Sequence, residues 1–257
     1  MSALRRAINE HPLTAFVIVA YILSWWSVPF ANGGIIPHGP FLSAVIILAI
    51  TKGRAGVGDL FRRMISWRGG WYWLLIGPGL VVAYLLLALA LNLLLGATIS
   101  NAFQLRTFIP SLVMLLLLGG VWEEPGWTGY ALPLLQNRYG NRPLGLLMAS
   151  LHMGIIRAVW HLPLVLSGAI PWYDAFLFSI AFQFLITWLT NRTGGSILIV
   201  MLFHLTSNIV GGGIMVPLFS GPDHTRYYVL FIAIAWLFAF LLAWRNNWSI
   251  GYQERTA

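Results

Sequence analysis

The sequence contains no cysteine and few charged residues. The lack of cysteine excludes disulfides, thiolate metal sites and a cysteine nucleophile. Only 9% of the residues are charged and 59% are hydrophobic, whereas a soluble domain usually carries about 25% charged residues. So few charges cannot cover a water-facing surface, and the composition therefore indicates an integral membrane protein. The net charge of +8 does not indicate a nucleic-acid partner, because the arginines fall between apolar runs.

Long apolar runs are abundant. A membrane-spanning helix needs about 20 mostly apolar residues, and seven or eight stretches qualify, of which the second is short. The basic N-terminus resembles a signal peptide, but its apolar part is longer than a signal sequence has and no A-x-A-like site follows, so we expect a retained helix. The sequence thus predicts an all-α fold, a polytopic membrane helix bundle with about eight transmembrane helices. The predicted spans are Leu13–Ala31, Pro40–Thr51, Trp71–Gly96, Thr107 to the Glu123–Glu124 pair, Pro143–Leu166, Trp172–Thr190, Ser196–Val216 and Tyr227–Trp244.

The arginines and the lysine predict the orientation. With a cytoplasmic N-terminus, twelve basic residues fall in inside segments, two (Arg106 and Arg226) fall in outside loops, and Arg157 lies within a span. The positive-inside rule then predicts eight spans with both termini cytoplasmic, in a bacterial cytoplasmic membrane. The basic segment 53–70 is expected to lie along the cytoplasmic interface.

Ionisable residues inside spans are costly and usually functional. Two of the seven acidic residues, Glu123 and Glu124, stand side by side at the end of an apolar run. They could simply end that helix at the cytoplasmic surface. A continuous helix, however, places Glu123 roughly 22 Å from Arg138, the next basic residue, which is mid-membrane. The strongly polar residues that we single out within the spans are Glu123, Glu124, His152, Arg157, His161, His204 and Asn208.

Spacing groups some of these residues on common helix faces. His204 and Asn208 are four residues apart and share a face, as do Arg157 and His161. Both His204 and Asn208 can donate hydrogen bonds to a developing oxyanion, or help to hold a metal. His152 is nine residues from His161 and faces the opposite way, so we interpret it as structural.

The chemistry of this set leaves two alternatives. A glutamate with two histidines could ligate zinc, or a glutamate with a histidine could activate a water molecule as a general base. The common zinc-protease motif H-E-x-x-H is absent.

Three motifs resemble those of a known family. The stretches are "EEPGWTGYALP" from Glu123, "WHLPL" containing His161, and His-x-x-x-Asn at His204 and Asn208. In order and spacing they resemble the CPBP family, the CAAX proteases and bacteriocin-processing membrane proteins, which includes the type II CAAX prenyl endopeptidases. The resemblance covers about residues 111–216. Two positions depart from the family pattern: its motif arginine is Thr128 here, and the aromatic residue often found four before the second-motif histidine is Arg157.

The resemblance implies roles for the motif residues. Glu123 and His161 would activate the attacking water, and His204 and Asn208 would form the oxyanion hole. Glu124 would contact these residues without touching the reacting atoms. We favour a mechanism without a cofactor. If a divalent metal such as zinc is bound, its ligands would be Glu123, His161 and His204.

The resemblance also implies an organisation and a function. We expect N-terminal transmembrane helices and a cytoplasmic amphipathic connector over residues 1–105, a protease-like core over residues 106–216, and a C-terminal transmembrane helix and tail over residues 217–257. The implied function is an intramembrane endopeptidase whose partners are the lipid bilayer and a membrane-anchored or lipidated peptide substrate.

Two other functions stay open. Glutamates, histidines and Arg157 within spans would suit a proton-coupled transporter, although no related halves are visible. The missing motif arginine would suit a catalytically silent immunity or scaffold protein. Only the protease hypothesis requires Glu123, His161, His204 and Asn208 to converge on one pocket.

The missing motif arginine leads to a geometric prediction. Thr128 follows Glu124 by four residues but carries no charge, and an unpaired carboxylate in a low-dielectric setting favours its neutral form. We therefore predict that Arg157 pairs with Glu124 from a neighbouring helix, within about 4 Å. The alternative is that Arg157 extends to the membrane interface.

Overall fold

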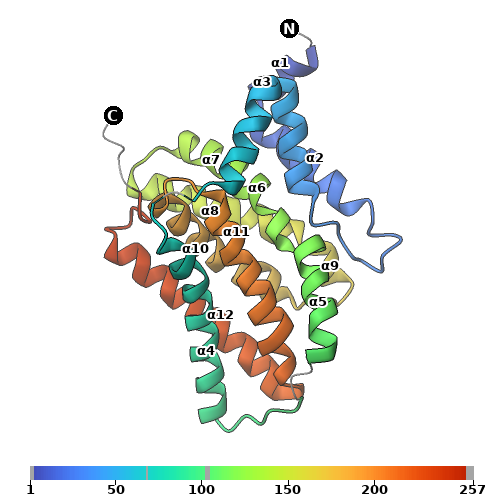
Figure 1. Cartoon of the computed structure of the whole chain (residues 1–257), viewed down its shortest axis with the longest axis vertical. Coiled ribbons are helices and arrows are strands. Elements are labelled where there is room, and N and C mark those ends of the chain that lie inside the picture. The colour runs from blue at the N-terminus through green and yellow to red at the C-terminus, as the bar shows by residue number, and fades with distance from the viewer. Residues whose placement is uncertain (1–2, 68, 102–104, 253–257) are drawn as a thin grey trace.

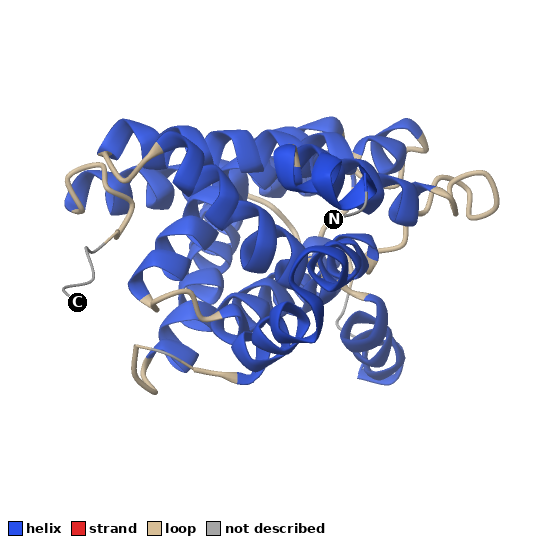
Figure 2. Cartoon of the chain, turned by 90° about the horizontal axis from the view of Figure 1, so that it is seen from above, coloured by secondary structure: helices blue, strands red, loops and turns tan. Residues whose placement is uncertain are grey.

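The computed structural model describes residues 3–67, 69–101 and 105–252, and these residues form helices and connecting loops (Figures 1 and 2). No β-strand occurs among them. The predicted all-α fold is therefore confirmed.

Seven helical segments among the described residues are long and apolar enough to cross a membrane. They become eight if α1 (Ala3–Glu10) and α2 (Pro12–Trp25), which meet at an angle of 104°, count as one span. The predicted membrane bundle is thereby confirmed, and the protein is an integral membrane protein. The seven segments are Gly39–Ile65, Trp73–Leu94, Phe108–Tyr139, Pro143–Trp160, Asp174–Arg192, Ile197–Leu218 and Gly221–Arg245.

The first predicted span, Leu13–Ala31, differs from the structure. Helix α2 begins at Pro12, which favours a helix start, and its 14 residues span only about 21 Å. Residues 26–33 turn back instead of continuing the helix, through bonds such as Gly33 N–H to the Val28 carbonyl (3.1 Å).

The second predicted span and the basic connector form one broken helix. Helix α3 (Gly39–Ile65) continues through the connector, with non-helical backbone at Gly53 (φ 62°, ψ −155°). Glycine tolerates this positive φ because it has no Cβ. Because of the break at Gly53, the basic half of α3 does not continue in line with the apolar half. This basic half ends with Arg62 and Arg63 in its last turn.

The remaining elements pack into two hydrophobic clusters. One joins α4 with α10 to α12 around Tyr84, Phe203 and Phe231, and the other joins α1 to α3 with η2, α7 and α8 around Phe16 and Trp127. Many large apolar side chains on the outer faces remain exposed, as membrane helices require. The further elements are α4 (Trp73–Leu94), α5 (Leu105–Leu118), η1 (Gly120–Trp122), α6 (Glu124–Gly126), η2 (Trp127–Ala131), α7 (Leu132–Tyr139), α8 (Pro143–Trp160), α9 (Leu162–Leu166), η3 (Asp174–Phe178), α10 (Ser179–Arg192), α11 (Ile197–Thr206), η4 (Ser207–Met215), η5 (Val216–Leu218) and α12 (Gly221–Arg245).

Helical irregularities gather near the motif residues. The segment from α5 to α7 breaks at Gly119, whose backbone is extended, and continues through the short helix η1 into the glutamate pair. Three elements, η2, η3 and η4, are π-helical. Such turns are rare and often occur at functional sites. The glutamate pair therefore lies between the break at Gly119 and the π-turn η2, in an irregular part of the span.

Candidate active site

The two glutamates lie in the interior of the protein. Glu123 is 5% exposed and Glu124 is fully buried. They follow the break at Gly119 and lead into the π-turn η2. The alternative that the pair merely ends a helix at the membrane surface is therefore wrong.

Glu124 accepts hydrogen bonds from three different elements. Arg157 Nη2 donates to Glu124 Oε1 (2.8 Å) and His204 Nδ1 lies 2.6 Å from the same oxygen. Thr128, one helical turn along, donates its hydroxyl to Oε2 (2.5 Å). A buried carboxylate is stable only when it is paired and hydrogen-bonded in this way. Glu124 therefore ties η2, α8 and α11 together.

Arg157 is buried and faces the glutamates. Its side chain is 2% exposed, and its Nη2 lies 3.5 Å from Glu123 Oε2 in addition to the contact with Glu124. Its Nη1 donates to Gln183 Oε1 on α10 (3.3 Å). The predicted pairing of Arg157 with Glu124 is confirmed, and the alternative of an arginine reaching the interface is wrong. Sequence reasoning missed Gln183, although a lone glutamine in an apolar span was a usable signal.

His204 has a defined hydrogen-bonding arrangement. Because Glu124 is held as a carboxylate by Arg157, the proton in the short contact belongs to His204 Nδ1. A neutral His204 ring then has an unprotonated Nε2, and only the imidazolium form donates a hydrogen bond from Nε2.

Gly120 allows His204 and Glu123 to meet. A Cβ atom at Gly120 would stand 2.3 Å from His204 Nε2 and 2.8 Å from Glu123 Oε1. These distances are too short for any side chain, so the backbone approaches both reactive groups closely only because the residue is glycine. Sequence reasoning missed Gly120, since glycine carries no chemistry of its own.

His161 lies just beyond the end of α8. Its Nδ1 is 2.9 Å from the Arg157 carbonyl, to which it donates a hydrogen bond, so a neutral ring presents Nε2 as an acceptor. Trp160 packs edge-on against this ring, with centroids 4.9 Å apart. By contrast, His152 bonds through Nδ1 with the hydroxyl of Tyr139 (2.9 Å), which connects α8 to α7 and agrees with a structural role.

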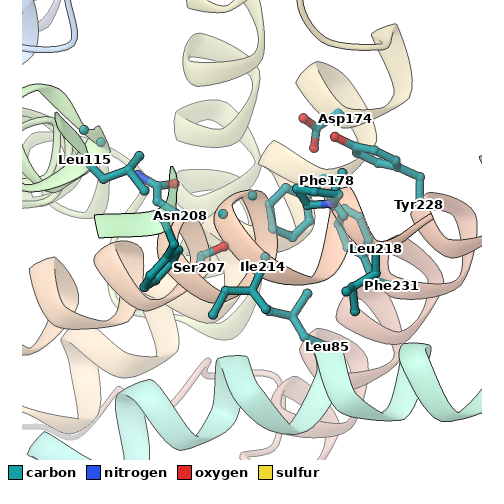
Figure 3. A pocket seen from close by; sticks show the side chains of 18 of the residues that line it. Leu85, Leu115, Asp174, Phe178, Ser207, Asn208, Ile214, Leu218, Tyr228 and Phe231 are labelled. Carbon is teal, nitrogen blue, oxygen red and sulfur yellow. The ribbon is translucent and has the colours of Figure 1, made fainter. Parts of the chain in front are cut away.

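Two adjoining cavities meet at these residues. The small cavity, of about 120 Å³, has Arg157, His161, His204 and Asn208 in its wall. The large cavity, of about 1120 Å³, shares Asn208 with it and is shown in Figure 3. Glu123 lines neither cavity, but it lies beside a residue of each one. Arg157 lines the small cavity and Gly120 lines the large cavity. The structure therefore brings three of the four predicted catalytic residues to one cavity and places the fourth beside it.

The predicted metal ligands are not arranged as a metal site. Within residues 3–67, 69–101 and 105–252, no group of three or more His, Asp or Glu side chains is placed to hold a metal ion. Glu123, His161 and His204 thus do not fit a zinc site as they stand.

Comparisons with known proteins agree with the three motifs. Residues 105–210 match the family model described as Type II CAAX prenyl endopeptidase Rce1-like. A CAAX prenyl protease 2 from Methanococcus maripaludis is 28% identical over 193 residues, which cover 66% of this chain and 67% of that protein. These findings support a CAAX-type intramembrane protease in general. The resemblance carried by the motifs is confirmed: this chain is similar to the Rce1-like CAAX prenyl endopeptidases, a family of membrane proteases.

Proposed function

We propose that the protein is an intramembrane endopeptidase that hydrolyses a peptide bond of a membrane-anchored or lipidated substrate. The observation that carries this proposal is the single small cavity lined by His161, His204 and Asn208, next to a buried glutamate pair. This arrangement holds a base, hydrogen-bond donors and room for water together, as peptide hydrolysis requires. The division into an N-terminal part, a core over residues 106–216 and a C-terminal helix is part of the proposal.

Charge balance supports the role of His204. The buried cluster contains two carboxylates, Glu123 and Glu124, and one guanidinium, Arg157. With both carboxylates ionised, a neutral His204 leaves one uncompensated negative charge, whereas a protonated His204 makes the cluster neutral. Buried charges are stable only when they are compensated. In the protonated form, Nε2 of His204 is a donor and suits a developing oxyanion.

The reaction follows from these hydrogen bonds. A water molecule that donates a hydrogen bond to Nε2 of His161 attacks the substrate carbonyl carbon while Glu123 takes its other proton. His204 Nε2–H and the Asn208 amide donate to the carbonyl oxygen as it becomes negative. The tetrahedral intermediate collapses when the carbon–nitrogen bond breaks, and the proton held by Glu123 passes to the leaving amine. No metal is needed in this sequence of steps.

The large cavity supports a substrate with an apolar segment. Its wall contains apolar side chains from several helices, such as Leu115, Phe178 and Leu218, together with the glycines of η4. This wall suits a lipid chain or an apolar peptide segment, and the curated relative is named a prenyl protease. The proton-coupled transporter and the silent scaffold remain alternatives, and peptide cleavage distinguishes them from the protease.

We expect the purified chain, reconstituted in lipid vesicles, to cleave a farnesylated peptide ending in a C-a-a-X sequence, with products identified by mass spectrometry. Asn208→Ala should lower kcat about 10²–10³-fold, because it removes one oxyanion donor. The matched control is Asn246→Ala at the end of α12, whose side chain bonds only locally, to the Leu242 carbonyl. Absence of cleavage by the unmodified chain across lipidated and unlipidated peptides would contradict the proposed function. Full activity of Asn208→Ala would contradict the oxyanion assignment alone.

Metal removal tests the choice of mechanism. We expect cleavage to persist after treatment with a strong zinc chelator, since Glu123 and His161 suffice to activate water. Elemental analysis of the active preparation should find well below one zinc ion per chain. A stoichiometric metal that is lost together with activity, and restored with it, would overturn the metal-free mechanism while leaving the endopeptidase in place.

A further inference from the structure

A carboxylate outside the three motifs, Asp174, stands where the two cavities meet. It is the first residue of η3 and lines both the small and the large cavity. Among the described residues that line the large cavity, it is the only Asp, Glu, Lys, Arg or His. A substrate that reaches the small cavity through the large one therefore passes a single ionisable side chain of these types.

The Asp174 side chain has no ionic partner in the described part of the chain. None of those residues forms a hydrogen bond or ion pair with its carboxylate. The nearest cationic wall residue, Arg157, already directs its guanidinium to Glu124, Glu123 and Gln183. The Asp174 carboxylate is thus left to interact with whatever enters the cavity, and a cationic group there would stabilise its ionised form.

Aromatic rings surround this carboxylate. Figure 3 shows Asp174 near the hydroxyl end of Tyr228, with Phe178 and Phe231 beside them. Phe231 packs against both other rings, with centroids 5.1 Å from each. A carboxylate combined with ring faces is an arrangement that stabilises ammonium and guanidinium groups, through charge and through cation–π attraction.

We propose that Asp174 selects substrates that carry a lysine or arginine side chain close to the scissile bond. The small cavity that holds His161 and Asp174 has a volume of only about 120 Å³, and an extended peptide advances about 3.3 Å per residue. The selected position therefore lies within roughly two residues of the bond that is cut. This assignment rests on the proposed function and adds a specificity to it.

The test compares peptides that differ at one position near the scissile bond, occupied by lysine, glutamine or glutamate. The unmodified chain in lipid vesicles should cleave the lysine peptide with a kcat/KM roughly tenfold above that of the glutamine peptide. Asp174→Asn keeps the size of the side chain and should remove this preference, and Asp174→Lys should shift it toward the glutamate peptide. The matched control, Asp59→Asn, removes an exposed carboxylate that pairs with Arg62 on α3, and should keep the preference.

Each outcome decides the assignment. Cleavage without a preference for lysine, or an equal preference in Asp174→Asn, refutes the role of Asp174 and leaves the proposed function standing. If no peptide is cleaved, the proposed function fails, and equilibrium binding of the same peptides decides the role of Asp174 by itself. Tighter binding of the lysine peptide that Asp174→Asn abolishes supports the site, and equal binding refutes it.

Discussion

Glu123→Gln is expected to abolish peptide cleavage, by roughly 10²–10⁴-fold or more if general-base action dominates. Glutamine keeps the size of the side chain and can still accept a hydrogen bond from Arg157, but it cannot take a proton from water. The variant also removes one of the two negative charges that face Arg157, while Glu124 keeps its three donors. Folding should therefore persist although catalysis does not.

The measurement is single-turnover cleavage of a peptide that the unmodified chain hydrolyses, with thermal unfolding followed in the same vesicles. Glu10→Gln on the exposed end of α1 provides the control for a change of one charge. Substantial cleavage by a well-folded Glu123→Gln variant would show that another group takes the proton.

Arg157→Leu is expected to lower stability and activity together. The substitution leaves Glu124 and Glu123 without their shared guanidinium, and breaking a buried pair by removing one partner costs about 3–5 kcal/mol. It also removes the bond to Gln183 and so loosens α8 from α10. The observable result is a lower midpoint of thermal unfolding and little or no cleavage. Arg245→Leu is the control, because it removes an exposed arginine at the end of α12, where substitutions usually stay within about 0.5 kcal/mol.

A second substitution shows whether the charge itself matters. Thr128 already bonds to Glu124 and occupies the position of the family's motif arginine. Thr128→Arg in the Arg157→Leu background should therefore restore part of both stability and activity, by supplying the guanidinium from η2. Arg157→Leu that is as stable and active as Arg245→Leu would refute the structural role of the pair. A destabilised variant that Thr128→Arg leaves unimproved would indicate that packing of the Arg157 side chain, rather than its charge, is lost.

Much of the site could be predicted from the spacing of residues along helices and from the free-energy cost of burying an ionisable group in a membrane. The helical character follows from the apolar runs, and the pairing of Arg157 with Glu124 follows because each would be unstable alone. Gln183 and Asp174 stand in a predicted apolar span and could have been noted there as polar residues, but their neighbours in space could not be predicted, nor could the close approach at Gly120. These roles depend on which segments meet: Gln183 contacts Arg157, 26 positions away, and Gly120 lies against His204 of another helix.

The bent N-terminus was also beyond local reasoning. Leu13–Ala31 is apolar enough to predict a span, but the direction of the chain after Trp25 depends on turns in residues 26–33. Hydropathy gives the length of an apolar run. It does not show whether the chain continues as a helix or turns back within that run.

For the proposed hydrolysis, the volume of the small cavity would limit the water available to react. Its roughly 120 Å³ have room for on the order of four water molecules, at about 30 Å³ each. In the proposed mechanism each hydrolysed bond would consume one of them, so the cavity would have to refill after a few turnovers at most. The adjoining large cavity would serve both as the route for this water and as the space for the substrate. A bulky substrate would then block the route, and each catalytic cycle would use water that entered before the substrate did.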